Sequence, residues 1–179
     1  NIIYEGEWIN NLKSGYGKLF ENNLLIYEGY LLNNNKSGYG KLYLNNMQYN
    51  GYFLDDLYNG EGELFINNIL YYKGFFKNGL KNHKGILYNN HYILYNGYFY
   101  NDSKHGNGIL YYENSDNILY NGNFINDLRD GFGILYWKNG NILYKGNWAN
   151  NMAHDYGIEY DIDGNIIYEG QWNYNNKLN

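Results

Sequence analysis

Residues 120–136 read YNGNFINDLRDGFGILY, and this stretch holds both motifs that decide the fold. The first motif is Tyr-x-Gly-x-aromatic, formed by Tyr120, Gly122 and Phe124. Because the side chains of a strand alternate between its two faces, these three residues share one face. The second motif is Gly-x-Gly followed by a Leu-aromatic pair, from Gly131 to Tyr136. The residues between the two motifs have loop chemistry, so the stretch predicts a β-hairpin.

Both motifs recur along the chain, and they define repeating units. The second motif keeps only its second glycine in two units, where His83 and Asp155 replace the first. The units begin at Tyr4, Tyr27, Tyr49, Tyr72, Tyr95, Tyr120, Tyr144 and Tyr168. The glycines of the first motif, to which we assign a structural role, are Gly6, Gly29, Gly51, Gly74, Gly97, Gly122, Gly146 and Gly170. We predict a single repeat array over residues 1–179, with a half unit at its end.

The predicted fold class is all-β. Stacked hairpins of about 23 residues each would form an elongated, single-layer antiparallel sheet, curved or twisted, with an aromatic groove. The polar residues 10–14 are expected to form the loop at the tip of the first hairpin. Helices are disfavoured because Gly, Asn and Tyr are poor or indifferent helix formers, and no apolar period of 3.6 residues occurs.

Regular glycines inside strands need a physical reason, because glycine weakens a strand. One reason is space: a large ring from a neighbouring hairpin would lie flat over the bare backbone. The other reason is strong local twist or curvature, which a residue without a Cβ atom permits. Both alternatives predict a curved sheet whose concave side is covered by aromatic rings.

The composition excludes several classes of protein. The 179 residues contain no Cys and no Pro, which excludes a disulfide framework and a Cys-ligated zinc site. The net charge of −5 argues against a nucleic-acid partner, because such proteins usually carry a basic excess. Aromatic residues make up 21% of the chain, which predicts a packed structure despite the abundant Asn.

No group of residues has the pattern of a catalytic or metal site. Two of the four histidines, His105 and His154, precede the Gly-x-Gly position in different units, whereas a metal ion needs several convergent ligands. No serine lies in a Gly-x-Ser-x-Gly elbow, and the Gly-x-Gly motifs lack the Lys of a phosphate-binding loop. We therefore expect no enzyme, no cofactor and no metal within these residues.

At its two glycine motifs the sequence resembles the MORN repeat family (membrane occupation and recognition nexus). The resemblance covers residues 1–179, with departures at Leu31, His83 and Asp155. It implies an elongated hairpin array without catalytic machinery. MORN repeats occur alone in scaffold proteins of cytoskeletal and cell-division structures, including those of protozoan parasites. They also occur beside membrane anchors, lipid kinases and a histone methyltransferase domain. Since the chain does not begin with Met, we expect it to be a fragment of a longer protein.

A column of basic residues is a candidate lipid-binding surface. One cation occupies the same hairpin-tip position in five units: Lys13, Lys36, Lys81, Lys104 and Arg129. Aligned along one edge, these side chains would meet anionic lipid headgroups, such as phosphoinositides. The alternative is a solvated edge, since acidic residues such as Asp56 and Asp127 crowd the same tips.

The aromatic residues are the strongest candidates for binding a protein partner. We expect Trp8, Phe53, Phe99 and Trp148 to pack between units, whereas Tyr30, Tyr52, Tyr98 and Trp172 would stay accessible along the groove. Exposed Tyr and Trp suit an extended peptide or a helix. The alternative is that every ring has a structural role.

Three functions follow from these features as hypotheses. The first is a non-catalytic scaffold for protein–protein interaction in a cytoskeletal or membrane-associated assembly. It would act inside the cell, in the cytoplasm, at the cytoskeleton or at the inner face of a membrane. A homodimer through a terminal repeat is expected, because open sheet edges invite pairing and repeats-only MORN proteins resemble antiparallel dimers. The second is a phospholipid-binding, membrane-targeting module, and the third is a regulatory array of a larger enzyme.

Overall fold

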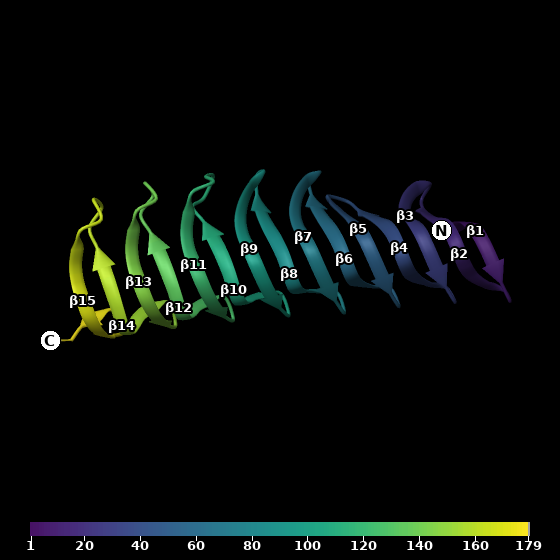
Figure 1. The fold of residues 1–179 in the computed structure, drawn as a ribbon. Coiled ribbons are helices and arrows are strands. Elements are labelled where there is room, and N and C mark those ends of the chain that lie inside the picture. The colour runs from purple at the N-terminus through teal and green to yellow at the C-terminus, as the bar shows by residue number, and fades with distance from the viewer. Residues whose placement is uncertain (179) are drawn as a thin grey trace. The chain divides into compact units, whose positions relative to one another are not determined.

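The structure is a computed structural model that describes residues 1–178, which form β-strands and no helix. The chain divides into two compact units, with the second beginning at Lys84. In each unit, strands consecutive in the chain lie side by side and run antiparallel (Figure 1). The predicted all-β fold of stacked antiparallel hairpins is therefore confirmed within each unit. That the two units act as one array stays a prediction.

Each long strand has eight to ten residues. The first unit contains β1 (Ile2–Ile9), β2 (Leu12–Glu21), β3 (Leu24–Leu32), β4 (Asn35–Leu44), β5 (Met47–Leu54), β6 (Leu57–Ile66), β7 (Ile69–Lys77) and the start of β8 (Leu80–Asn89). The second contains the rest of β8 and β9 (Tyr92–Tyr100), β10 (Ser103–Tyr111), β11 (Ile118–Ile125), β12 (Leu128–Tyr136), β13 (Ile142–Ala149), β14 (Met152–Tyr160), β15 (Ile166–Asn173) and the short β16 (Asn176–Lys177).

The hairpin tips are two-residue turns. Asn10 and Asn11 join β1 to β2 with φ angles of 51° and 63°. Two consecutive positive φ angles define the type I′ turn, and Asn and Asp are the residues besides Gly that adopt them most readily. The abundant Asn thus has a structural use. The prediction of a loop over residues 10–14 is wrong, because β2 begins at Leu12 and Lys13 pairs with Trp8.

The motif glycines form a row across the sheet. Gly51 in β5 pairs with Gly40 on one side and with Gly62 on the other. A Cβ atom on Gly51 would lie 2.5 Å from the Tyr49 Oη and 2.6 Å from the Gly62 Cα. No side chain fits there, so the expectation that glycine is needed for space is confirmed. The expected source of the ring is wrong: the ring belongs to the same hairpin, because Tyr49 lies two residues before Gly51 on the same face.

The core lies on this glycine-bearing face, which we call the inner face. Five tyrosines that begin repeats are fully buried: Tyr27, Tyr49, Tyr72, Tyr95 and Tyr120. The Tyr49 hydroxyl donates to the Tyr52 carbonyl at 3.0 Å, so its polar end is satisfied. Phe53 packs edge-on between Tyr27 and Tyr49, with ring centroids 5.5 and 5.2 Å away. These alternating rings join consecutive hairpins.

Of the other three rings that were expected to pack between units, two are buried and one is exposed. Phe99 and Trp148 are buried, like Phe53. Trp8 is 57% exposed, so its predicted packing between units is wrong. It contacts Tyr4 of its own hairpin, with centroids 5.2 Å apart, whereas Phe53 also packs on Tyr27 of the preceding repeat.

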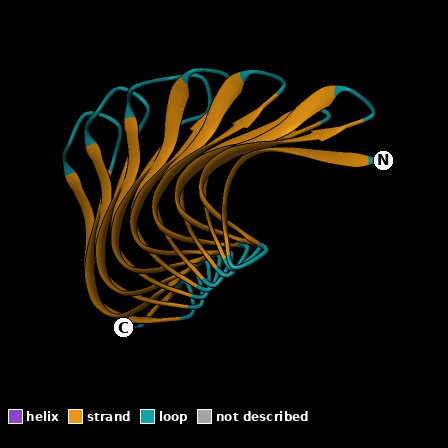
Figure 2. Ribbon diagram, turned by 90° about the vertical axis from the view of Figure 1, so that its right-hand side faces the viewer, coloured by secondary structure: helices purple, strands orange, loops and turns teal. Residues whose placement is uncertain are grey.

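The strands curve strongly along their length (Figure 2). Next to the glycine row, the pairing register shifts, for example between Gly51 and Phe53. Such bulges increase the bend and twist of a strand. The first glycine of the Gly-x-Gly motif lies nearby in the left-handed region, with φ of +86° at Gly131. Space for a ring and local curvature, the two alternative reasons for the glycines, therefore both apply, at different positions of the motif.

The two replacements of this left-handed glycine keep its backbone conformation. His83 and Asp155 have φ angles of 58° and 54°. Asp155→Gly is expected to raise the free energy of unfolding by about 1 kcal/mol, because a residue with a Cβ atom is strained there. Urea denaturation of both proteins measures this. The reverse change, Gly131→Asp, has room for a Cβ at 3.4 Å from Asn123 and should destabilise by a similar amount. A loss of stability in Asp155→Gly would contradict the strain argument.

Candidate functional site

The basic residues at the hairpin tips lie over the core tyrosines. Because the turns have two residues, Lys36 pairs with Leu31 and so faces the inner side. Its Nζ lies 5.7 Å from the centroid of the Tyr27 ring. The distances from Lys13 to Tyr4, Lys81 to Tyr72, Lys104 to Tyr95, and Arg129 to Tyr120 are 5.6, 5.9, 5.8 and 5.6 Å. The column is thus a set of cation–π contacts that cover the core.

The third and seventh repeats fill this position differently. Tyr58 stacks on Tyr49 with a centroid distance of 3.8 Å and an interplanar angle of 18°. Ala153 occupies the position in the seventh repeat and is buried. An aromatic ring or a methyl group can therefore replace the cation, which shows that the position covers the core.

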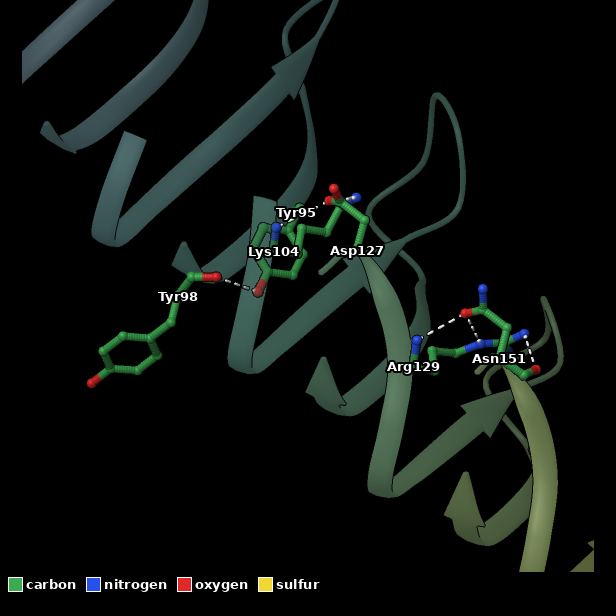
Figure 3. Close-up of polar contacts among 6 residues, drawn as sticks. All are labelled: Tyr95, Tyr98, Lys104, Asp127, Arg129 and Asn151. Atoms are coloured by element: carbon green, nitrogen blue, oxygen red, sulfur yellow. Dashed lines mark hydrogen bonds and ion pairs between the residues drawn. The ribbon is translucent and has the colours of Figure 1, made fainter. Parts of the chain in front are cut away.

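The same residues are joined to the turn of the next hairpin (Figure 3). The Lys104 N–H donates to the Asp127 Oδ1 at 3.0 Å, and the Asp127 N–H donates back to the Lys104 carbonyl at 3.0 Å. The Lys104 Nζ also contacts that carboxylate at 3.0 Å. Arg129 and Asn151 repeat the reciprocal pattern, at 2.8 and 2.9 Å. We call this pair of hydrogen bonds the tip staple.

The tip staple engages the charges that were expected to bind lipid. The Lys36 and Lys104 side chains are each 22% exposed and paired with Asp56 and Asp127. Burial by itself raises the pKa of the Asp127 carboxyl, but the hydrogen bonds from Lys104 outweigh it, and the pKa lies below its usual range. Stabilisation from this pair is therefore present at neutral pH and lost in acid. The basic column is therefore not a set of five freely solvated cations.

Removing one staple tests its contribution. Asp127→Gly is expected to lower the free energy of unfolding by about 0.5–1 kcal/mol, because the loss of the acceptor for the Lys104 N–H outweighs the relief of strain at a φ of 69°. Glycine adds no backbone strain here, and Gly79 holds the equivalent turn position, with its N–H 2.9 Å from the Tyr58 carbonyl. Urea denaturation is the measurement.

Asp127→Asn is the matched control. The amide oxygen keeps the backbone acceptor, as in Asn151, and only the ion pair is lost, so a change below about 0.5 kcal/mol is expected. An equal loss in the Asn and Gly variants would show that charge, and not the backbone hydrogen bond, carries the contribution.

Three of the four predicted groove residues are exposed, but on the other face of the sheet. Tyr30, Tyr52 and Tyr98 are 52%, 49% and 42% exposed. Each follows a motif glycine directly, and since neighbours in a strand point to opposite faces, each points away from the inner face. Figure 3 shows Tyr98 directed away from Tyr95 and Lys104. The predicted groove on the inner face is instead filled by buried rings.

The fourth predicted groove residue, Trp172, is buried, so its assignment is wrong. Only 7% of it is exposed, and its Nε1 donates to the Gly157 carbonyl at 3.2 Å. It packs edge-on against Tyr144 and Tyr168, with centroids 5.4 and 5.2 Å away. Trp172 stands at the aromatic position of its motif, as Phe53 does, and the period-two alternation places both on the inner face.

The outer face of the first unit carries two pairs of exposed aromatic rings and a fifth exposed ring. Tyr16 pairs across the strands with Tyr30, Tyr39 pairs with Tyr52, and Glu61 pairs with Phe75. The first two pairs are edge-to-face, each with centroids 5.6 Å apart. We call the exposed set the outer aromatic row: Tyr16, Tyr30, Tyr39, Tyr52 and Phe75. In the second unit, Asn107 and Asn123 form the equivalent pair, and Phe132 faces Asn147.

Sequence reasoning missed the tip staple and three of the five residues of the outer aromatic row. The signal for the staple was the pair of Asn or Asp residues at the hairpin turn of most repeats, such as Asn126 and Asp127. The signal for the row was the middle residue of Gly-x-Gly, since Tyr16 and Tyr39 occupy that position. Within residues 1–178, no group of three or more His, Asp or Glu side chains is arranged to hold a metal ion. The same residues include no helix suited to crossing a bilayer.

Comparison with known families agrees with this geometry. The MORN repeat profile matches residues 4–23, 27–46, 49–68, 72–90, 95–117, 120–142 and 144–166. The matches begin at the tyrosines that open the hairpins. No curated protein matches the chain. MORN repeats mediate interactions with proteins or lipids. With seven matches spread over most of its length, the chain belongs to the MORN repeat family.

Proposed function

We propose that the chain is a non-catalytic scaffold that binds protein partners through the outer aromatic row. The observation that carries this proposal is the exposure of five large rings, each between 41% and 52%, on one face of the first unit. Exposed large rings gathered on one face mark interaction sites, and Tyr is enriched where protein interfaces gain most of their affinity. The scaffold would organise a cytoskeletal or membrane-associated assembly inside the cell.

A matched pair of variants tests this function. Tyr30→Ala with Tyr52→Ala removes two exposed rings, whereas Phe132→Ala removes an exposed ring that faces Asn147 in the second unit. Affinity purification with quantitative mass spectrometry should recover a set of proteins with the wild type and with Phe132→Ala, and lose it with the double variant. Recovery of the same proteins by all three forms would contradict the proposal.

Self-association is part of the proposal and has its own test. Light scattering coupled to size exclusion should give twice the chain mass of 21.2 kDa at micromolar concentration. The physical support is that backbone groups at a sheet edge pair readily with another strand. A monomer mass at all concentrations would refute the homodimer, but it would not contradict the binding of other proteins.

Lipid binding through the basic column is the weaker candidate. Lys36 and Lys104 already contact an aromatic ring and a carboxylate, so each would have to leave both before meeting a headgroup. Co-sedimentation with phosphoinositide vesicles distinguishes the two functions. Binding that Lys36→Gln with Lys104→Gln abolishes would favour the lipid function. A role as the regulatory array of a larger enzyme remains a further proposal, which the full reading frame tests.

A further inference from the structure

Seven asparagines of the chain stand directly before a glycine, and such a pair is chemically labile. The glycine nitrogen can attack the asparagine Cγ, because no side chain shields the nitrogen and the glycine backbone rotates freely. A cyclic succinimide forms as the C–N bond of the amide breaks and ammonia leaves, and water then opens the ring to aspartate or isoaspartate. The seven asparagines are Asn50, Asn59, Asn78, Asn96, Asn107, Asn121 and Asn139.

Five of these pairs lie inside strands, where the backbone opposes the reaction. They are the pairs of Asn50 in β5, Asn59 in β6, Asn96 in β9, Asn107 in β10 and Asn121 in β11. To react, an asparagine must rotate until the next backbone nitrogen meets its own side chain. An extended strand holds the two groups apart, and its hydrogen bonds to the neighbouring strands oppose the rotation.

The pair of Asn139 and Gly140 lies in a connector, but its side chain is held in place. The Asn139 Oδ1 accepts the Asn141 N–H at 3.0 Å, and its Nδ2 donates to the Ile162 carbonyl at 3.1 Å. Both bonds must break before the amide carbon can approach the Gly140 nitrogen. This pair is therefore protected by its side-chain hydrogen bonds.

Asn78 and Gly79 form the two-residue turn between β7 and β8, with φ angles of 50° and 84°. Asn78 is exposed, and no residue in the described range 1–178 forms a hydrogen bond with its side-chain amide. The Asn78 N–H donates to the Asn59 Oδ1 at 3.4 Å, which is longer than usual. Exposed tips of this kind are among the first parts of a protein to open.

This turn also has only half of a tip staple. The Gly79 N–H donates to the Tyr58 carbonyl at 2.9 Å, but glycine has no side chain to accept the Tyr58 N–H in return. The tips with both bonds include the pairs Lys13 and Asn34, Lys36 and Asp56, Lys104 and Asp127, Arg129 and Asn151, and Ala153 and Asn175. Opening the Asn78 turn, which frees the Gly79 nitrogen for attack, thus breaks one hydrogen bond fewer than at those tips.

We propose that Asn78 is a site of spontaneous deamidation, at which the turn between β7 and β8 is converted to isoaspartate. Isoaspartate forms when water breaks the bond between the succinimide nitrogen and the main-chain carbonyl. The chain then runs through Cγ and gains one methylene, so the turn no longer has the geometry that joins its two strands. The Gly79 nitrogen moves away from the Tyr58 carbonyl, and the tip loses its remaining staple bond. This inference is independent of the proposed protein-binding function.

Peptide mapping by mass spectrometry, after incubation in mildly alkaline buffer, measures the conversion at each asparagine. In guanidinium chloride, where the chain is unfolded, the seven sites should react at similar rates. In the folded protein we expect Asn78 to react at least ~5-fold faster than each of the other six, since the fewest hydrogen bonds hold it. A folded-state rate at Asn78 that does not exceed the rate at Asn139 would overturn the proposal.

Gly79→Asn tests whether the missing staple bond is the cause. Asn34 holds the equivalent position of another tip with a φ of 75°, and its Oδ1 accepts the Lys13 N–H at 3.0 Å. The variant should therefore complete the staple. The ratio of the unfolded-state rate to the folded-state rate at Asn78 cancels the chemical effect of replacing glycine, and it should rise ~3-fold. An unchanged ratio would refute the half staple as the cause.

The structural consequence has its own measurement and control. Wild-type protein in which Asn78 has been converted should unfold at a lower urea concentration than fresh protein. Asn78→Gly keeps a two-residue turn of a favoured type and has no amide to lose, so the same incubation should leave its urea midpoint unchanged. An equal fall in midpoint in both proteins, or no fall in the converted wild type, would refute the loss of the turn contact.

Discussion

Gly62→Ala is expected to lower the free energy of unfolding by about 3 kcal/mol or more, enough to unfold a marginally stable unit. A Cβ atom on Gly62 would meet the Tyr49 ring, with the Cζ at 2.6 Å and the Oη closer still. The ring has no empty space to enter, because Tyr49 is fully buried and stacked against Tyr58. Urea denaturation followed by circular dichroism measures the effect.

Gly140→Ala is the control that separates the cost of a steric clash from the cost of backbone strain. A Cβ on Gly140 would meet nothing within 4 Å, but its φ is +94°, so alanine there should cost about 1 kcal/mol through strain alone. Gly62 has no positive φ, so its cost comes from the ring. Equal costs at the two positions would contradict the role of Tyr49 in excluding a side chain.

Alkaline unfolding is the second large effect. Burial is the main cause that raises the pKa of the Tyr27, Tyr49, Tyr95 and Tyr120 hydroxyls well above the usual range, and that of Tyr144 to about 12. Below the unfolded pKa of about 10, both states are protonated and stability is complete. At higher pH only the unfolded state ionises, and stability falls by about 1.4 kcal/mol per pH unit for each buried tyrosine.

The expected result is a steep loss of structure about one to two pH units above pH 10, since typical stabilities are only about 5–15 kcal/mol. Absorbance from the buried tyrosinates should appear only in the step in which ellipticity is lost, after any earlier rise in absorbance that leaves the ellipticity unchanged. Tyr49→Phe keeps the ring and removes one ionisable group, so its transition should be less steep. Full ionisation of the tyrosines with unchanged ellipticity would contradict their burial.

The hairpins and the need for glycine were predictable because both follow from local rules. Alternation in a strand puts Tyr49, Gly51 and Phe53 on one face, and the fixed offset of the second motif requires a return strand. The ring that covers Gly51 was assigned to the wrong hairpin. Its identity depends on the register that sets Gly51 opposite Gly62, and on the hydrogen bond from Tyr49 to the Tyr52 carbonyl. Neither is fixed by the spacing of residues in one strand.

The loop over residues 10–14 was predicted wrongly, although the sequence carries a signal for the shorter turn. A five-residue loop would leave Lys13 at a solvated tip, whereas a two-residue turn at Asn10 and Asn11 pairs Lys13 with Trp8 on the inner face. Two asparagines in succession are a signal for the shorter turn. The tip staple was harder to predict from the sequence, because it joins residues of different hairpins, such as Lys104 and Asp127. Their relative position depends on how the hairpins pack.

The candidate binding surface was predicted only in part. Exposure of Tyr30 and Tyr52 was anticipated, but they were placed on the face of the core, although each is one residue from a motif glycine. Strict use of the alternation would have put them on the outer face and Trp172 on the inner one. Their pairing with Tyr16 and Tyr39 needs the register across hairpins, which only the structure shows.

A double-mutant cycle between Tyr49 and Gly62 tests the central claim, that the tyrosine ring occupies the space a side chain at the glycine row would need. Unfolding free energies of the wild type, both single variants and Tyr49→Ala with Gly62→Ala would be measured in urea, with sucrose present to keep the weaker variants folded. We predict that Gly62→Ala costs about 3 kcal/mol or more with the ring present and less than about 1 kcal/mol without it. The same cost in both backgrounds would contradict the account.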